Sequence, residues 1–456
     1  MLDQNTQLAQ ATFGQAQLGD TRLRDRLVVL AARCFKAPAG TVTSVLSDVA
    51  EREGAYRFLE NPRVAACALM AAQAAATATA ARAEPFIFVP IDGSSLSLTD
   101  RAGKRDVGVV GAHKYKARGL IVVSALGVSA DGTPLGLLGQ SWWTRDRVKK
   151  AARRELLHST DVIDDVLSLM SDKAPSTQVW LQLDRLYDAQ LVLEHLANKD
   201  TLFTVRANHN RRLHTPGTST RTYVANRIRS SPIIGRHRVE VPAANGLPTR
   251  IAELDVRVID TVVSAKRKSK TRCPIALTYI EVREPRRRDA LRWTLITNAP
   301  VKTLDDAIKV VDGYTTRWRI EEFHRAWKRG VCRVEDTQLR GRQAIMKWAT
   351  ILGAVAARAT RLTYLARSKP DLPASGEFSP LEMAAAVLLS TRPVDVDHFT
   401  LAEMIDLVAK LGGYTGKSSG GPPGATTLAR GLRRVVDTAA ALAALKQRPA
   451  ILSKIR

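Results

Sequence analysis

Cysteine is scarce in this sequence, and its few cysteines form no metal-binding or disulfide pattern. The chain of 456 residues has four, none of them in CxxC spacing: Cys34, Cys67, Cys273 and Cys332. This argues against a zinc ribbon and against a disulfide framework. It fits a protein of a reducing cytoplasm, in which each cysteine is an ordinary buried or half-buried thiol.

Long apolar runs are also missing. The most apolar segment, residues 64–83 (VAACALMAAQAAATATAARA), carries glutamine and threonine and is typical of a helix in a water-soluble protein. The first residues, MLDQNTQLAQATFGQAQ, have neither a basic start nor an apolar stretch, so we expect no secretory signal. We therefore expect no membrane partner and a cytoplasmic location.

Acidic residues are too few to balance the basic ones. The chain has 69 Lys and Arg against 44 Asp and Glu, which gives a net charge of +25 and a pI near 10.3. An anionic membrane surface, or the ribosome for a plain basic protein, could bind such a chain. Because neutralising phosphates with Lys and Arg releases condensed counterions, the excess favours nucleic acid as the partner.

The first 65 residues are predicted to form a helical domain with a basic face. In LGDTRLRDRLVVLAARCFK one stripe at helical spacing is apolar, and a neighbouring stripe carries Arg22, Arg26 and Arg33. The apolar stripe consists of Leu23, Leu27, Leu30 and Cys34. A solvated basic face and a helix that lies along a DNA groove explain this pattern equally well.

From Pro85 onward the periodicity predicts a mixed α/β sheet covered by helices. A buried strand ends at Asp92, a β-hairpin turns at Asp131–Gly132, and a second strand ends at Asp184. Helices are expected at about 149–170 and after Asp184. Short alternating runs between about 208 and 293 predict an antiparallel β insertion.

Helices return at Thr303, where TLDD has the character of a capping box, and continue to about residue 367. The segment SKPDLPASGEFSP then separates a C-terminal helical region, residues 368–456. The prediction is thus three domains: 1–65, 66–367 and 368–456.

Two aspartates follow directly on buried strands. Catalytic and binding groups of α/β sheets commonly lie at strand ends, which makes Asp92 and Asp184 candidates for chemistry. Aspartate is also a frequent turn or cap residue, and for either position alone this is the better explanation.

The segment DGYTTRWRIEEFHRAWKRG contains a third candidate carboxylate. On a helix with about 100° per residue, Glu321 shares a face with Tyr314, Arg317 and Lys328. Ile320, Phe323 and Trp327 lie opposite, as a stripe that faces the core. Glu322 points elsewhere, so Glu321 is the favoured catalytic glutamate. An exposed helix laced with ion pairs is the alternative.

Three carboxylates could together hold two divalent cations. Mg²⁺ prefers oxygen ligands and leaves positions for water and phosphate. Two such ions about 4 Å apart can activate a water or a 3′-hydroxyl for in-line attack on a phosphodiester. The basic chain is therefore plausible as a nuclease or a strand-transfer enzyme.

With these residues assembled, the sequence resembles the insertion-sequence-four family of cut-and-paste DDE transposases, in particular its transposon-five branch. The family signature Tyr-x2-Arg-x3-Glu-x6-Lys is present at Tyr314, Arg317, Glu321 and Lys328. Further segments that are similar to the family are LGDTRLRDRL, EGAYRFLENP, IDGSSLSL, LDRLYD, WTLITNAPV and LVAKLGGYTGK, so the resemblance covers nearly the whole chain.

The resemblance implies a fold and a metal site. The fold is an RNase H-like mixed-sheet catalytic domain with an antiparallel β insertion, flanked by helical N- and C-terminal domains. Asp92, Asp184 and Glu321 would be the catalytic, metal-binding triad. The cofactor would be Mg²⁺, two ions per active site, and we expect Mn²⁺ to substitute.

The resemblance also implies DNA contacts. Tyr314, Arg317 and Lys328 would hold the DNA backbone near the cleaved phosphate, together with Arg206. Trp293 would stack at a flipped base, and Trp318 either helps there or belongs to the core. Arg26, Lys36 and Arg57 match end-recognition positions. Leu23 stands where the family pattern has arginine, and FKAPAGTV also departs from it, which would fit a different end sequence.

The implied activity is transposition in a bacterial cell, at the nucleoid. Two subunits would form a synaptic complex on double-stranded DNA through their C-terminal regions, each cutting the end bound mainly by the other. Nicking, hairpin formation, hairpin opening and joining to target DNA would follow at one site. Two alternatives remain: a catalytically silent DNA-binding regulator, and a metal-dependent nuclease without strand transfer.

Overall fold

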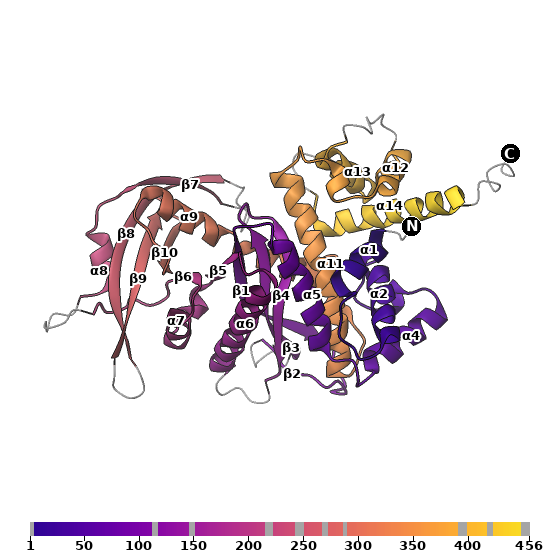
Figure 1. Cartoon of the computed structure of the whole chain (residues 1–456), viewed down its shortest axis with the longest axis horizontal. Helices are drawn as coiled ribbons and strands as arrows, with labels where there is room; N and C mark the ends of the chain where they lie inside the picture. Colours follow the sequence, from indigo (N-terminus) through magenta and orange to yellow (C-terminus); the bar gives the residue numbers. More distant parts are fainter. Residues whose placement is uncertain are drawn as a thin grey trace.

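A ten-stranded mixed sheet forms the centre of the molecule and separates two hydrophobic layers. The computed structural model describes residues 4–111, 117–145, 151–214, 222–241, 250–266, 272–285, 290–390, 399–416 and 423–447. The sheet order is β2-β3-β1-β5-β6-β10-β9-β8-β7, with β4 paired to β3. In Figure 1 the strands β7 to β10 occupy one end of the molecule, and the helices α1 Gln4–Phe13 and α14 Ala425–Gln447 lie toward the other.

Five helices precede the sheet. They are α1 Gln4–Phe13, α2 Thr21–Lys36, α3 Val42–Val45, α4 Val49–Glu60 and α5 Ala66–Ala81. Asp20 and Asp48 cap α2 and α4, because each side chain accepts a hydrogen bond from a backbone N–H of the first turn. Leu27, Leu30 and Cys34 of α2 are buried, so the expected apolar stripe does face the core.

The N-terminal helices are tied to a long helix far along the chain, α11 Arg342–Ser368. The buried Nζ of Lys347 donates to the backbone carbonyls of Leu59 and Asn61, at 2.9 and 2.7 Å. Trp348 donates its ring N–H to the carbonyl of Gly40 at 2.7 Å. A buried ammonium is tolerated here because two carbonyls satisfy it.

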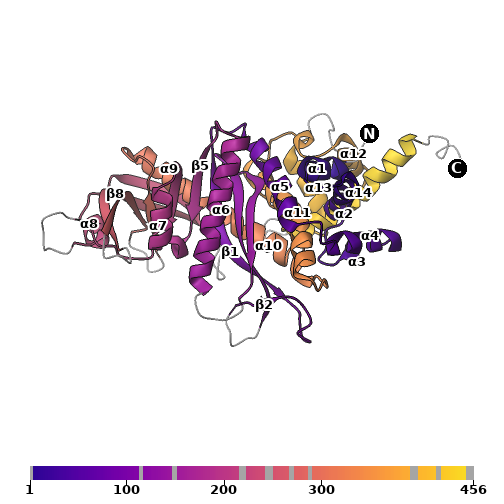
Figure 2. The ribbon, with the colours of Figure 1, turned by 60° about the horizontal axis from the view of Figure 1, so that its bottom comes forward.

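The central part has the predicted order of a strand, a hairpin, a helix, a strand and a helix, with the short strand β2 added before the hairpin. They are β1 Phe86–Leu98, β2 Gly108–Val109, β3 Arg118–Ser129, β4 Pro134–Trp143, β5 Gln178–Leu183 and β6 Leu202–Arg206. Helix α6 Ala151–Lys173 precedes β5, and η2 Arg185–Tyr187 and α7 Gln190–Ala197 precede β6. The β3–β4 hairpin turns at Gly132, whose φ of +89° suits glycine. In Figure 2, α6 crosses the front of the sheet.

The β insertion continues this sheet and does not form a separate one. It contains α8 Val224–Arg229, β7 Gly235–Val241, β8 Arg250–Lys266, β9 Arg272–Arg283 and β10 Arg292–Thr297, with antiparallel neighbours throughout. Strand β10 pairs antiparallel with β6, whereas β1, β5 and β6 run parallel. The mixed α/β sheet with helical N- and C-terminal regions confirms the predicted fold class.

Helices resume with α9 Leu304–Thr315, which Thr303 and Asp306 begin with the expected capping box. Then follow α10 Trp318–Lys328, η3 Val334–Asp336 and α11. The sequence analysis treated residues 314–328 as one helix. That was wrong in detail, because the helix is interrupted between Thr315 and Trp318. Tyr314 therefore lies in the last turn of α9, and Glu321 and Lys328 belong to α10.

The C-terminal region has a hydrophobic cluster of its own, which starts at Leu362 near the end of α11. Its elements are η4 Ala374–Gly376, α12 Pro380–Leu388, α13 Leu401–Leu411 and α14 Ala425–Gln447. None of the described helices is long and apolar enough to span a membrane.

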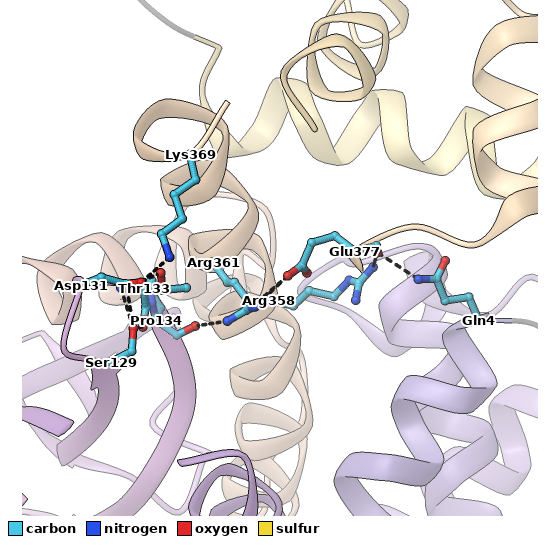
Figure 3. A network of polar contacts seen from close by, with 9 residues as sticks. All are labelled: Gln4, Ser129, Asp131, Thr133, Pro134, Arg358, Arg361, Lys369 and Glu377. Carbon is cyan, nitrogen blue, oxygen red and sulfur yellow. Dashed lines mark hydrogen bonds and ion pairs between the residues drawn. The ribbon is translucent and has the colours of Figure 1, made fainter. Parts of the chain in front are cut away.

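A polar network joins this region to the rest of the molecule at the end of α11 (Figure 3). The backbone carbonyl of Glu377 accepts from Gln4 at 2.9 Å and from Arg358 at 3.2 Å, and its carboxylate binds Arg361 at 2.8 Å. Lys369 forms an ion pair with Asp131 in the turn of the β3–β4 hairpin. The first helix, the hairpin and the C-terminal segment thus meet at one junction.

Candidate functional site

Asp92 and Asp184 lie side by side on neighbouring strands. Strands β1 and β5 are parallel, and their last registered pair is Ile91 with Leu183. Asp92 and Asp184 are the next residues, so the two carboxylates come together at the carboxyl end of β5. Asp184 follows its strand as predicted, whereas the predicted strand end at Asp92 was wrong, because β1 continues to Leu98. Asp184 also caps η2, because its Oδ1 accepts from the backbone N–H of Leu186 at 2.7 Å. Asp184 therefore caps η2 and also lies beside Asp92 at the candidate site.

Glu321 lies on α10, which packs against β1 and α11, and its negative charge acts on Asp92. Ile320, Phe323 and Trp327 of this helix are fully buried, as the helical pattern predicted. The Glu321 carboxylate binds Arg317, with Oε1 2.7 Å from Nη2. The neighbouring Glu322 instead pairs with Arg319 at 2.8 Å, on another face of the helix.

The electrostatics show that the three carboxylates share one environment. Burial, together with the negative charges of Asp184 and Glu321, raises the pKa of Asp92 to about 7, against the lowering effect of Arg317. Like charges that are held together in this way disfavour ionisation unless a cation balances them. The cluster is therefore suited to a positive ligand.

The arrangement is nevertheless not a finished metal site. Among the residues that the structure describes, no three His, Cys, Asp or Glu side chains are placed to hold a metal ion together. One oxygen of Glu321 is bonded to the Arg317 guanidinium. The donors fit a hard cation such as Mg²⁺, which takes carboxylate oxygens, once Glu321 turns from Arg317 toward the aspartates.

The other residues of the signature surround the carboxylates. Lys328 donates from Nζ to Oγ of Ser94 at 3.3 Å and lies 3.8 Å from the Glu335 carboxylate. Arg317 is 8% exposed, and its Nε is buried without a partner among the described residues. Burial raises the pKa of Tyr314, whose hydroxyl also lacks a partner there.

Three aromatic rings pack together beside the site. Trp293 of β10 is 3% exposed, and its ring meets those of Tyr314 and Trp318 edge-on, at centroid distances of 5.4 and 5.8 Å. Trp318 is half-buried, and so is Arg206, which ends β6. Trp293 thus belongs to the packed surface of the site, and its ring is covered in the DNA-free chain.

The N-terminal candidates lie on the first helices, apart from the carboxylates. Arg26 and Arg57 are exposed, and Arg57 forms an ion pair with Glu53 of the same helix. Lys36 is not free, because its Nζ lies 2.9 Å from the carboxylate of Asp437 in the C-terminal helix α14.

Two side chains at the site were missed by the sequence analysis. His324 lies three residues after Glu321, and its Nδ1 is 3.8 Å from Oδ2 of Asp92. Burial lowers the pKa of His324 to about 3, with a further contribution from Lys328, so the imidazole is neutral. Its i,i+3 relation to Glu321 was a signal that could have revealed it.

Glu155 of α6 is the second. A methyl group at Gly93, the residue after Asp92, would stand 2.3 Å from its Oε1, so the Glu155 carboxylate covers this part of β1. Burial raises the pKa of Glu155, Arg145 lowers it and Asp184 raises it again. Nothing in the local sequence connects Glu155 with the two strand ends, since only the packing of α6 on the sheet brings it there.

Three protein-family models match successive parts of the chain. A transposase DNA-binding domain matches residues 5–64, a transposase DDE domain residues 156–357, and a transposase Tn5 dimerisation domain residues 354–444. The DDE match includes Asp184 and Glu321, and Asp92 lies N-terminal to it. Domains of this kind generally use divalent metal ions, in agreement with the donor set.

The types of domain that are matched agree with the arrangement of the described elements. Acidic side chains meet at the edge of a mixed sheet, basic side chains surround them, and helical regions lie on either side in the chain. By its domain composition, with matches to a transposase DNA-binding domain, a transposase DDE domain and a transposase Tn5 dimerisation domain in one polypeptide, this chain is similar to DDE transposases of the Tn5 type.

Proposed function

We propose that this DDE transposase works by cut and paste, as a member of the insertion-sequence-four family. It binds the inverted-repeat ends of its element, excises the element through a hairpin intermediate and joins the 3′-hydroxyl ends to target DNA. The observation that carries the proposal is that Asp92 and Asp184 lie next to each other on the parallel neighbours β1 and β5, where the charge of Glu321 also acts on Asp92. The DNA-binding and dimerisation matches on either side support it.

In this proposal Asp92, Asp184 and Glu321 hold two Mg²⁺ ions. When bound, such ions lower the pKa of an attacking water or hydroxyl and stabilise the leaving oxygen of the phosphodiester. The three carboxylates supply the negative charge that favours the binding of Mg²⁺. The burial of Asp92 reduces the screening of this charge by bulk water.

Four phosphodiester steps follow at this one site. Water attacks the phosphate at the element's end and releases its 3′-hydroxyl. That hydroxyl attacks the opposite strand, forms a hairpin and displaces the flanking DNA. Water opens the hairpin, and the 3′-hydroxyl then attacks target DNA. Each step exchanges one phosphorus–oxygen bond for another, so no covalent bond to the protein is needed.

The basic side chains position the DNA for these steps. The Arg317 guanidinium, which is nearly buried and only partly satisfied, binds a backbone phosphate, and Lys328 does the same from the next turns of α10. When Arg317 moves to phosphate, Glu321 is released toward Asp92 and Asp184. DNA binding and completion of the metal site are thereby coupled.

The three packed aromatic rings, those of Trp293, Tyr314 and Trp318, take part in the hairpin step. Trp293 stacks on a base that is flipped out of the end, with Tyr314, Trp318 and Arg206 beside it. Because Trp293 is covered by Tyr314 and Trp318 in the DNA-free chain, these rings shift when the base enters. Arg26, Lys36 and Arg57 read the end through the N-terminal helices.

We propose the domain division 1–65, 66–367 and 368–456, and two subunits in the synaptic complex. The separate hydrophobic cluster beyond Leu362 supports the last boundary. Each subunit cuts the end that its partner mainly binds, on DNA at the nucleoid of a bacterial cell. Mn²⁺ substitutes for Mg²⁺.

One reaction separates this proposal from its alternatives. The chain is incubated with Mg²⁺ and a labelled duplex that carries the inverted repeat flanking its gene, together with plasmid as target. A hairpin followed by a strand-transfer product is expected. Binding without cleavage would identify a silent regulator, and cleavage without hairpin or joining would identify a simple nuclease. Glu321→Ala is the negative control.

A further inference from the structure

His324 is the nearest side chain to Asp92 for which the proposed chemistry gives no role. Its imidazole is 7% exposed, and its Nδ1 lies 3.8 Å from Oδ2 of Asp92. The ring packs against Phe323 and Trp327, which stack on each other, with centroid distances from His324 of 5.4 and 6.5 Å. This packing restricts how the imidazole can turn.

The second nitrogen of the ring argues against a purely space-filling role. The Nε2 atom is buried and has no hydrogen-bond partner among the described residues. An apolar side chain of similar size would fill the same space without leaving a polar atom unsatisfied, which is costly in a protein interior. A histidine at this position is explained if its other nitrogen has a task.

The surroundings also decide which nitrogen carries the proton of the neutral ring. An Nε2–H would be a buried donor without an acceptor, and it would turn the lone pair of Nδ1 toward a carboxylate oxygen. With the proton on Nδ1, a donor faces Oδ2 of Asp92, and only an acceptor remains unpaired. Unpaired buried acceptors are tolerated better than unpaired donors.

We propose that His324 is a positioning residue for Asp92, whose Oδ2 accepts a hydrogen bond from its Nδ1–H when the carboxylate binds a divalent ion. A hydrogen bond of this kind requires about 2.7–3.2 Å, so the pair closes by less than about 1 Å from its present distance. The bond fixes which oxygen of Asp92 faces the ion. The inference rests on the proposed function, since it assumes that Asp92 is a metal ligand.

Two substitutions at His324 test the donor itself. His324→Asn places an amide N–H close to the position of Nδ1, whereas His324→Leu keeps a similar volume without a donor. The matched control is His195→Leu, because His195 also bonds an aspartate, with Nε2 2.9 Å from Asp164, but on helix α7 away from the site. Thermal unfolding of each full-length variant monitors the fold.

The first measurement is Mn²⁺ binding to the full chain, with free Mn²⁺ counted by electron paramagnetic resonance. Loss of an outer-shell partner typically weakens metal binding by about 10- to 100-fold. We expect this loss for His324→Leu, a change within about threefold for His324→Asn, and none for His195→Leu. A folded His324→Leu with wild-type affinity would overturn the proposal, as would an Asn variant as weak as the Leu variant.

The second measurement is the metal dependence of cleavage. If His324 positions Asp92, His324→Leu raises the Mn²⁺ concentration for half-maximal cleavage, and saturating Mn²⁺ restores most of the rate. A lower rate at every Mn²⁺ concentration with an unchanged midpoint would overturn the positioning role. If the wild-type chain itself neither binds Mn²⁺ nor cleaves its ends, the proposed function fails first. A wild-type chain that does both, with an unaffected His324→Leu, leaves the function standing and removes this inference alone.

Discussion

Nη2 of Arg317 lies 2.7 Å from Oε1 of Glu321, one helical turn further along the chain. The arginine is nearly buried and the glutamate side chain is 49% exposed, so the pair stands between the protein interior and the surface that DNA would approach. The described carboxylates do not form a group that could hold a metal ion. If Glu321 is a metal ligand, as proposed, Arg317 competes with the metal for its carboxylate.

Replacing Arg317 should therefore affect metal binding and cleavage in opposite directions. In Arg317→Ala the Glu321 carboxylate loses its partner, and Mn²⁺ affinity without DNA should rise by about two- to fivefold, the size of a partly exposed ion pair. Cleavage should fall by about 100-fold because a phosphate contact is lost. Arg319→Ala, which removes the analogous pair with Glu322, should change neither. Weaker Mn²⁺ binding by Arg317→Ala would contradict the competition.

The two adjacent glutamates should differ sharply in importance. Glu321→Ala should reduce cleavage by at least about a thousandfold and leave end binding largely intact, because many cations share the grip on DNA. Glu322→Ala removes only an ion pair with Arg319 and should keep most of the activity. Gel-shift and cleavage assays on the same duplex measure both. A lethal Glu322→Ala beside an active Glu321→Ala would refute the assignment.

Trp293 should matter most for the hairpin. Base–aromatic stacking contributes about 1–3 kcal/mol, so Trp293→Leu should slow hairpin formation by about tenfold or more relative to the first nick. Leucine is used because Trp293 is 3% exposed, and alanine would also leave a cavity. Trp142→Leu is the control, because the ring of Trp142 packs on Trp327, whereas the ring of Trp293 packs on Tyr314 and Trp318. Equal slowing of nick and hairpin would exclude a stacking role.

Asp92 should make the metal-free chain less stable as the pH rises. Its pKa is about 7 in the folded chain and near 3.8 when unperturbed, so between these values the folded state holds a proton that the unfolded state has lost. Stability falls across this window. Asp92→Asn removes the effect and should raise the melting temperature in EDTA at pH 8 but hardly at pH 4.

Asp131 provides a control of opposite sign. Burial alone would raise its pKa, but bonds from Lys369, Ser129 and Thr133 hold it well below its usual value. Its contribution to stability is present above the unfolded pKa and is lost as the pH falls, so Asp131→Asn should destabilise the chain at pH 7 more than at pH 3.

If Asp92→Asn stabilised the chain equally at pH 4 and pH 8, the explanation of the Asp92 effect by a buried carboxylate would fail.

The ion pair between Lys36 and Asp437 should restrain end binding. Asp437 is 53% exposed, and such a pair contributes up to about 1 kcal/mol, so Asp437→Asn should tighten end binding by at most about fivefold. Lys36→Gln should weaken it, and the double variant should resemble Lys36→Gln. The measurement is a salt titration of duplex affinity. An Asp437→Asn variant with unchanged affinity would show that Lys36 is already free to bind.

Much of the fold was readable because it depends on local patterns. The strand that ends just before Asp184, the turn at Gly132 and the capping box at Thr303 each follow from a few neighbouring residues. The predicted strand end at Asp92 was wrong, because β1 continues to Leu98. The break between Thr315 and Trp318 was not readable, because both helices carry the same apolar periodicity. The pairing of β10 with β6, which joins the insertion to the central sheet, could not be predicted either. Two strands that are distant in the chain carry no local sequence pattern that shows their pairing.

The sequence by itself determined the kinds of groups and their order: a basic chain, an aspartate on each of two buried strand segments and a helix with Glu321 opposite an apolar stripe. Spacing along one helix is enough for this, because its geometry is fixed by the backbone. Only the tertiary structure decided what surrounds them. It set His324 beside Asp92, Glu155 over Gly93 and Asp437 against Lys36. These contacts join segments that are distant in the chain or come from different elements, and they depend on packing, which no local pattern encodes.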